Sequence, residues 1–141
     1  MTSELKQVLK HLIYSSRPFG FDQNTLNGIL VTSVDNNKRD QITGALICRS
    51  DLYLQYLEGP AESIHETFHK IQHDDRHVEI KVLKEGMHAE RLFPKWAMRD
   101  DPVRSWMWSR EEVDTGALDN ISASDAFNIF QRHSKELLDL Q

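Results

Sequence analysis

One primary amide, that of Gln55, interrupts an otherwise apolar run at residues 52–57. An amide head buried without hydrogen-bond partners costs roughly 1–3 kcal/mol, so this position needs partners for its N–H donors and its oxygen. The partner is either the backbone, which would make Gln55 an ordinary core residue, or a polar group that the fold brings to it. Tyr14, near the end of an apolar stretch at residues 8–15, offers a phenol hydroxyl and would reach Gln55 from a neighbouring strand.

Two neighbouring amides and a guanidinium occur together at Asn36, Asn37 and Arg39. Amide heads match the alternating donors and acceptors of a heteroaromatic ring, and a guanidinium suits a phosphate. These residues would therefore suit the mouth of a ligand cleft. Turn chemistry for the Asn pair and a solvent-exposed Arg explain the same pattern equally well.

Trp96 and Met98 are two residues apart in the segment 93–98, which we interpret as the last strand. This spacing puts both side chains on one face of a strand, and a slip by two residues would put one in the place of the other. The segment is therefore a candidate two-position element. A Trp and Met pair in a hydrophobic core is the simpler alternative.

Four histidines recur at every fourth position, a spacing that can bind a transition metal on a helix. They are His65, His69, His73 and His77. The apolar positions of the same segment direct them toward solvent, and no cysteine or carboxylate completes a ligand set, so we expect no metal site.

Cys48 lies in an apolar run and is expected to be a buried structural thiol. Hydrolase and phosphate-loop motifs do not occur in the sequence.

The elements that must position these residues follow from hydrophobic periodicity. Runs at residues 44–48 and 52–57 are apolar on both faces, as in inner strands, and flank a polar break, which predicts a β-hairpin that residues 58–60 end. Further strands are expected at residues 8–15, 78–85 and 93–98, and helices at 22–35 and 61–72. Asn36 and Asn37 would end the first helix. The order β-α-β-β-α-β plus one strand is typical of an α+β, ferredoxin-like fold, with both helices on one face of the sheet.

The character of the chain changes after residue 100. Ser109 and Glu112 have capping-box spacing, as do Ser122 and Asp125, and the second pair opens an amphipathic helix. Its apolar positions are Phe127, Phe130, Leu137 and Leu138. A segment this short buries no core of its own, so it must pack on the sheet or on another chain. We therefore expect a domain at residues 1–100 and a C-terminal helical extension for signalling or oligomerisation at residues 101–141.

The composition is that of an ordinary globular domain, with 141 residues of which 39% are hydrophobic and 28% charged. A net charge of −5 argues against a general binder of nucleic acid or of anionic membranes. A single cysteine excludes an internal disulfide and fits a reducing compartment. The first residues lack an apolar signal segment, and no run approaches the length of about 20 residues that spans a membrane. We expect a cytoplasmic protein.

Five segments between residues 9 and 98, about two thirds of the chain, together resemble the BLUF family of blue-light sensors that use FAD. They are LIYSS at 12–16, NNxRxxITG at 36–44, LQYLEGP at 54–60, DDRH at 74–77 and AERxFPxWxM at 89–98. Each segment is a weak signal alone. In this order and spacing the set is highly specific.

The resemblance implies that the chain binds FAD non-covalently, with the isoalloxazine ring between the two helices and on the sheet. Tyr14 would be the photochemical donor of an electron and a proton. Gln55 would be the mediator, whose amide rotates or tautomerises to give a slightly red-shifted state that decays in the dark. Cofactor contacts are implied, residue by residue, for Ile29, Asn36, Asn37, Arg39, Gln55, Arg76 and His77. Among them, Ile29 would form an apolar wall and Arg39 would lie near the ribityl-phosphate side.

The resemblance also implies how the signal leaves the domain. Trp96 and Met98 would relay the change at Gln55 to the C-terminal helices. The residues after Met98 are too few for a nucleotide cyclase, a phosphodiesterase or a DNA-binding domain. We therefore expect no enzymatic activity, and output to a separate effector protein, by analogy a cyclic-dinucleotide enzyme or a transcription regulator. A bacterial homo-oligomer without direct nucleic-acid or membrane binding is implied.

Three positions depart from the common pattern of the family. Ser15 stands where many relatives carry Val or Arg after the Tyr. Tyr56 follows Gln55 and is expected to offer a competing electron donor, and the hairpin lacks the usual turn glycine.

Two alternatives of other functional classes remain. A flavin-free ferredoxin-like protein-interaction module is the first, and an acylphosphatase-like enzyme, whose Gly-rich loop after the first strand is missing here, is the second.

Overall fold

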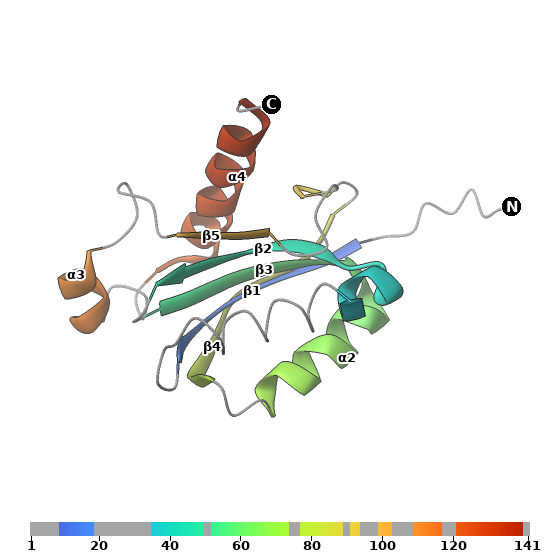
Figure 1. Ribbon diagram of the computed structural model, residues 1–141, viewed down its shortest axis with the longest axis horizontal. Coiled ribbons are helices and arrows are strands. Elements are labelled where there is room, and N and C mark those ends of the chain that lie inside the picture. Colours follow the sequence, from blue (N-terminus) through green and yellow to red (C-terminus); the bar gives the residue numbers. More distant parts are fainter. Residues whose placement is uncertain are drawn as a thin grey trace, which may run out of the picture.

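The structure is a computed structural model that describes residues 9–18, 35–49, 52–73, 77–88, 91–93, 99–102, 109–116 and 121–139. Its centre is a five-stranded sheet in the order β4-β1-β3-β2-β5 (Figure 1). The strands are β1 (Leu9–Pro18), β2 (Thr43–Arg49), β3 (Leu52–Pro60), β4 (His77–His88) and β5 (Arg99–Pro102). The helices are α2 (Ala61–Gln72), α3 (Arg110–Asp114) and α4 (Ala123–Asp139), and residues 35–40 are also helical.

The pairing of the strands confirms the predicted α+β, ferredoxin-like fold. The pairs β1/β3, β1/β4 and β2/β3 are antiparallel, and β5 adds to β2 in parallel. The hairpin is present, with β3 between β1 and β2. All residues of β3 except Pro60 are buried. β3 continues through the residues expected to end it, because Leu9 and Lys10 of β1 pair with Pro60 and Gly59.

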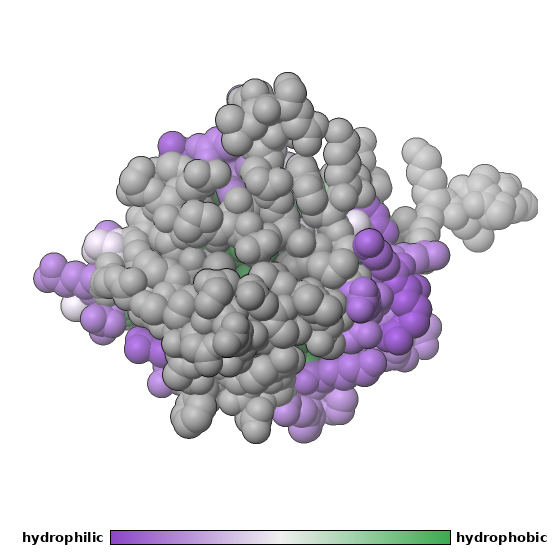
Figure 2. Space-filling view, viewed as in Figure 1, coloured by the Kyte–Doolittle hydropathy of each residue, from purple (hydrophilic) through white to green (hydrophobic). Residues whose placement is uncertain are grey.

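The two faces of the sheet carry separate hydrophobic clusters and separate helices (Figure 1). On one face, Ile64 of α2 is buried, and Phe68 and Ile71 pack against the cluster. The outward positions of α2 are polar, and hydrophilic side chains gather on this side of the molecule (Figure 2). On the other face, Ala126 and Phe130 of α4 are fully buried. Of the two alternatives expected for the C-terminal helix, packing on the sheet or on another chain, the structure shows packing on the sheet.

Of the helix expected at residues 22–35, residues 22–34 lie outside the described residues, and the described helical residues continue beyond the expected end. Residues 35–40 are helical, so Asn36 and Asn37 lie within the helix rather than at its end. The N–H of Ile42 donates to the carbonyl of Asn37 at 2.8 Å and that of Gln41 to Lys38 at 3.5 Å, while Gln41 has a φ of 63°. These bonds form a Schellman motif with a non-glycine residue in the left-handed position. The helix therefore ends by backbone capping at Gln41.

The last strand also differs from the prediction. Phe93 is not in a strand, residues 94–98 lie outside the described residues, and the strand that extends the sheet is β5, at Arg99–Pro102. Its backbone pairs in parallel with Ala45 to Cys48 of β2.

Both predicted capping sites begin a helix. The Ser109 hydroxyl accepts the N–H of Glu112 at 3.1 Å, and the Glu112 carboxylate accepts the N–H of Ser109 at 3.0 Å. The Ser122 hydroxyl accepts the N–H of Asp125 at 3.0 Å, directly before α4. Within the described part of the chain, none of the helices has the length and apolar character needed to cross a membrane.

Candidate functional site

Tyr14 and Gln55 meet directly on the α2 side of the sheet. The two residues are register partners in the β1/β3 pair, and the Tyr14 hydroxyl donates a hydrogen bond to Oε1 of Gln55. Both side chains are buried, with exposed fractions of 4% and 5%. The Tyr14 ring packs against Phe68 of α2, with ring centroids 5.5 Å apart. The two residues lie on neighbouring strands, as expected, and the register of these strands brings the phenol and the amide together.

A second buried amide lies in the helical residues 35–40. Asn37 has an exposed fraction of 2%, and Asn36 is half-buried. Arg39, in contrast, lies at the surface and donates to the two carboxylate oxygens of Asp40 at 3.1 and 3.2 Å. The hydrogen bond to Asp40, and the charge of that carboxylate, raise the pKa of Arg39. The structure therefore places Arg39 in a surface ion pair with its neighbour.

Several candidate residues lie outside the described part of the chain. Ile29, Arg76, Trp96 and Met98 belong to this group. His77 is the first residue of β4, where its backbone pairs with Pro18 at the far end of β1, and its side chain is not described. The roles expected for these five residues stay predictions.

The chemistry of Tyr14, Gln55 and Asn37 fits the cofactor of the predicted site. Two amides and one phenol, all buried, supply both donors and acceptors of hydrogen bonds. The pyrimidine edge of a flavin presents alternating N–H and carbonyl groups, which such a set can bind. An amide in particular can exchange its donor end for its acceptor end without movement of the backbone. A buried phenol bonded to such an amide can pass a proton to it.

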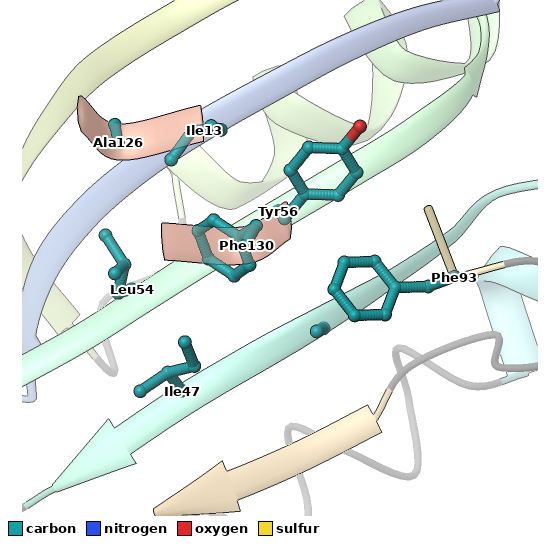
Figure 3. Close-up of a cluster of buried hydrophobic side chains, with 8 residues drawn as sticks. Ile13, Ile47, Leu54, Tyr56, Phe93, Ala126 and Phe130 are labelled. Carbon is teal, nitrogen blue, oxygen red and sulfur yellow. The ribbon is translucent and has the colours of Figure 1, made fainter. Parts of the chain in front are cut away.

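Tyr56 lies on the opposite side of the sheet from Tyr14 and Gln55. Successive residues of a strand point to opposite faces, so the residue after Gln55 must face α4. Its ring lies 5.5 Å from that of Phe93 and 5.3 Å from that of Phe130, centroid to centroid (Figure 3). Burial first, and the neighbouring Glu58 second, raise the pKa of Tyr56. The expectation that Tyr56 competes as an electron donor at the cofactor is therefore not supported by its position.

Sequence reasoning missed a buried polar site around Glu58. We assigned Glu58 to the end of a strand, but it lies within β3 and is fully buried. Its carboxylate accepts hydrogen bonds from the hydroxyl of Thr43 and from backbone amides of residues 92 and 93. The sequence contains a signal for this site, because a charged residue directly after a run that is apolar on both faces needs buried partners if the strand continues through it.

Two of the exposed histidines lie close together at the end of α2. The rings of His69 and His73 have centroids 4.6 Å apart, and Nδ1 of His73 lies 2.8 Å from the carbonyl oxygen of His69. Among the described residues, no group of three or more His, Cys, Asp or Glu side chains is placed to hold a metal ion. The Cys48 side chain lies outside the description.

Comparison with known proteins gives relatives that respond to light. Photoactivated adenylate cyclase subunit beta of Euglena gracilis is 28% identical over 91 residues, which are 64% of this chain and 10% of that protein. The subunit beta of Euglena longa is 29% identical over 91 residues, again 64% of this chain and 10% of that protein. The chain thus spans about a tenth of the length of these relatives.

Solved structures with the same fold include one that matches this chain over most of its length. The dark-state structure of BlrB, a BLUF protein, has a TM-score of 0.76 and 28% identity, covering 94% of this chain and 99% of that one. A bacterial light-regulated adenylyl cyclase has a TM-score of 0.66 and 31% identity, covering 93% of this chain and 36% of that one. The model of the BLUF family, "Sensors of blue-light using FAD", matches residues 9–99 of the 141-residue chain. With most of its length matched by that model, the chain belongs to the BLUF family, the sensors of blue light that use FAD.

Proposed function

We propose that this chain is a blue-light photoreceptor in which Tyr14 and Gln55 carry out the photochemistry. The observation that carries the proposal is the buried hydrogen bond from the Tyr14 hydroxyl to Oε1 of Gln55. FAD supplies blue-light absorption and a site that accepts an electron. Gln55 and Asn37, with Asn36 at the edge, hold the polar side of the ring. Ile29, Arg39, Arg76 and His77 are further contacts by family position.

In the dark, the Tyr14 hydroxyl fixes which end of the Gln55 amide faces it, because a donor hydroxyl selects the carbonyl oxygen. After excitation, Tyr14 would give one electron to the bound flavin and pass its phenol proton through Oε1 of Gln55 toward the same ring, and the hydrogen bond that held the amide would be lost. Gln55 then rotates or tautomerises. When the electron and proton return, Tyr14 is a phenol again, while Gln55 keeps its new hydrogen bonds. The altered bonding of the amide is the signal, and it persists until the amide returns to its dark arrangement.

The output of the sensor runs through the C-terminal part of the chain. Trp96 and Met98 pass the change at Gln55 from residues 1–100 to the helical extension at residues 101–141, and the extension acts on a separate effector protein. The chain has no enzymatic activity of its own, works in the cytoplasm and forms a homo-oligomer. Relatives support a cyclic-nucleotide effector, since they include photoactivated adenylate cyclases and a Klebsiella pneumoniae protein, BlrP1, studied with FMN and cyclic diGMP.

A visible absorption spectrum of the purified protein before and after blue light tests the proposal. We expect an oxidised-flavin spectrum that shifts slightly to the red and recovers in darkness. Tyr14→Phe and Gln55→Leu abolish the shift and keep the flavin bound. Tyr56→Phe is the matched control, because the Tyr56 phenol lies on the α4 side of the sheet. We expect this variant to keep the red shift. A colourless protein that does not take up FAD would contradict the proposal and favour a flavin-free interaction module.

A further inference from the structure

Glu58 lies on the strand of Gln55 but faces the other helix. It follows Gln55 by three residues in β3, so its side chain is on the α4 side, with Tyr56. Its register partners are Thr43 in β2 and His11 in β1. The carboxylate is fully buried in the middle of the sheet. A charge in this position is costly unless several donors face it.

The donors come mainly from a short segment after β4, residues 91–93, which we call the strap. Oε1 of Glu58 accepts the N–H of Leu92 at 2.8 Å, and Oε2 accepts the N–H of Phe93, also at 2.8 Å. The Thr43 hydroxyl donates to Oε2 at 3.0 Å. Both oxygens are therefore used, and two consecutive backbone amides of the strap are fixed to β3.

Arg91 fixes the other end of the strap. Its guanidinium donates to the Thr43 hydroxyl at 2.8 Å and to the carbonyl oxygen of Glu58 at 3.3 Å. It also donates to the carbonyl oxygen of Gln41 at 2.8 Å, where the helix that contains Asn37 ends. The strap thus contacts β2, β3 and the end of that helix.

The opposite side of the strap contacts α4. The Ser134 hydroxyl donates to the carbonyl oxygen of Leu92 at 2.7 Å. The Phe93 ring packs edge-on against Phe130 and lies 6.2 Å from that of His133, centroid to centroid. Leu92 therefore bonds through its N–H to Glu58 of β3 and through its carbonyl to Ser134 of α4. One residue of the strap links the sheet to the helix.

We propose that Glu58 is a positioning residue for signal output, which couples β3 to α4 through the strap. The inference rests on the proposed function, because it assumes that a change at Gln55 shifts β3. A small displacement of β3 moves the Glu58 carboxylate, and the bonded amides of the strap move with it. Since α4 is bonded and packed to the same strap, its docking on the sheet changes. This route uses residues other than Trp96 and Met98, although the strap directly precedes the segment that contains them.

Hydrogen exchange of backbone amides in α4, measured in darkness and under blue light on the full chain, tests this inference. Glu58→Gln keeps the shape of the side chain but replaces one acceptor oxygen by an NH₂ group, so one strap amide loses its acceptor. Ser134→Ala removes the contact from the helix side. Glu66→Gln and Ser124→Ala are matched controls at exposed positions of α2 and α4.

We expect the wild-type protein and both controls to show a light-dependent change in exchange at residues 123–139. Glu58→Gln and Ser134→Ala keep the red shift of the flavin and lose that change, and the double variant behaves like either one. If Glu58→Gln does not bind flavin, Ser134→Ala alone decides. The inference is overturned if both variants keep the full change, or if α4 of the wild-type protein exchanges equally in darkness and light. In both cases a normal spectral shift leaves the proposed function standing, whereas a missing shift in the wild-type protein overturns both.

Discussion

At the scale of single residues, the Tyr14 and Gln55 pair explains why an amide is needed in the middle of a buried strand. A leucine at position 55 would suit the apolar strand but could not accept a hydrogen bond from the Tyr14 hydroxyl. A glutamate would offer two equivalent oxygens, so its rotation would leave the hydrogen bonds unchanged. An amide has a donor NH₂ group at one end and an acceptor oxygen at the other, so its rotation changes the hydrogen bonds. The sequence indicates that Gln55 needs a partner, because it is the one polar residue in an apolar run. The strand register, which the sequence does not give, places Tyr14 opposite it.

The raised pKa of Tyr56 leads to a prediction about stability at alkaline pH. In the unfolded chain a tyrosine loses its proton near about pH 10. In the folded protein, burial and the nearby Glu58 keep the Tyr56 phenol protonated beyond that pH. Above pH ~10 the unfolded state therefore binds fewer protons, and the free energy of unfolding falls as the pH rises, by up to about 1.4 kcal/mol per pH unit from this group.

Urea unfolding of wild-type protein and Tyr56→Phe between about pH 8 and about pH 11 measures this effect. Tyr56→Phe should lose less stability than the wild type over the upper part of that range, since it has no phenol to titrate. Parallel stability curves for the two proteins would mean that Tyr56 does not resist ionisation in the folded state.

At the scale of elements, the sequence predicts what hydrophobic burial determines. The hairpin, α2 and the docking of α4 all follow from apolar periodicity, and all are present. Two of the boundaries that differ from the prediction are determined by the backbone. The helix at residues 35–40 ends in a Schellman motif at Gln41, where glycine would be the usual signal. β5 consists of Arg-Asp-Asp-Pro, and it pairs at the edge of the sheet through main-chain bonds that need no apolar pattern.

Gly44 is required in β2 by the close approach of β3. A Cβ atom at this position would lie 2.0 Å from the carbonyl oxygen of Tyr56. Since that obstacle is backbone, the two strands would have to separate, and Gly44→Ala should cost about 2–4 kcal/mol of unfolding free energy. Thermal or urea unfolding measures the loss.

Gly86→Ala is the comparison for Gly44→Ala, because the atoms nearest to its Cβ belong to the side chains of His11 and Lys84. Side chains adjust more easily than backbone, so the loss at Gly86 should be smaller. An equal or smaller loss at Gly44 would show that β2 and β3 separate without much cost.

At the scale of the whole molecule, the sheet separates the Tyr14 and Gln55 pair from the surface on which α4 packs. Successive side chains of β3 point to opposite faces of the sheet. Gln55 faces α2, whereas Tyr56 and Glu58 face α4. The Glu58 site could not be assembled from the sequence, because its donors come from residues 43 and 91–93, far apart in the chain. Two of these donors are backbone N–H groups, which every residue type except proline has, so the residue types at these positions do not identify them.

This separation predicts that α4 can be loosened without loss of the photochemistry. Phe130 is fully buried against Tyr56 and Phe93, on the side of the sheet opposite to Tyr14 (Figure 3). Phe130→Ala should lower the free energy of unfolding by about 3–4 kcal/mol, because it leaves a cavity between α4 and the sheet. The flavin should still shift to the red in blue light, while α4 amides exchange faster in darkness. Asn128→Ala, at an exposed position of the same helix, is the control and should change neither quantity. Loss of the red shift in a folded, flavin-bound Phe130→Ala protein would show that the α4 side of the sheet also holds the Tyr14 and Gln55 pair in its dark arrangement.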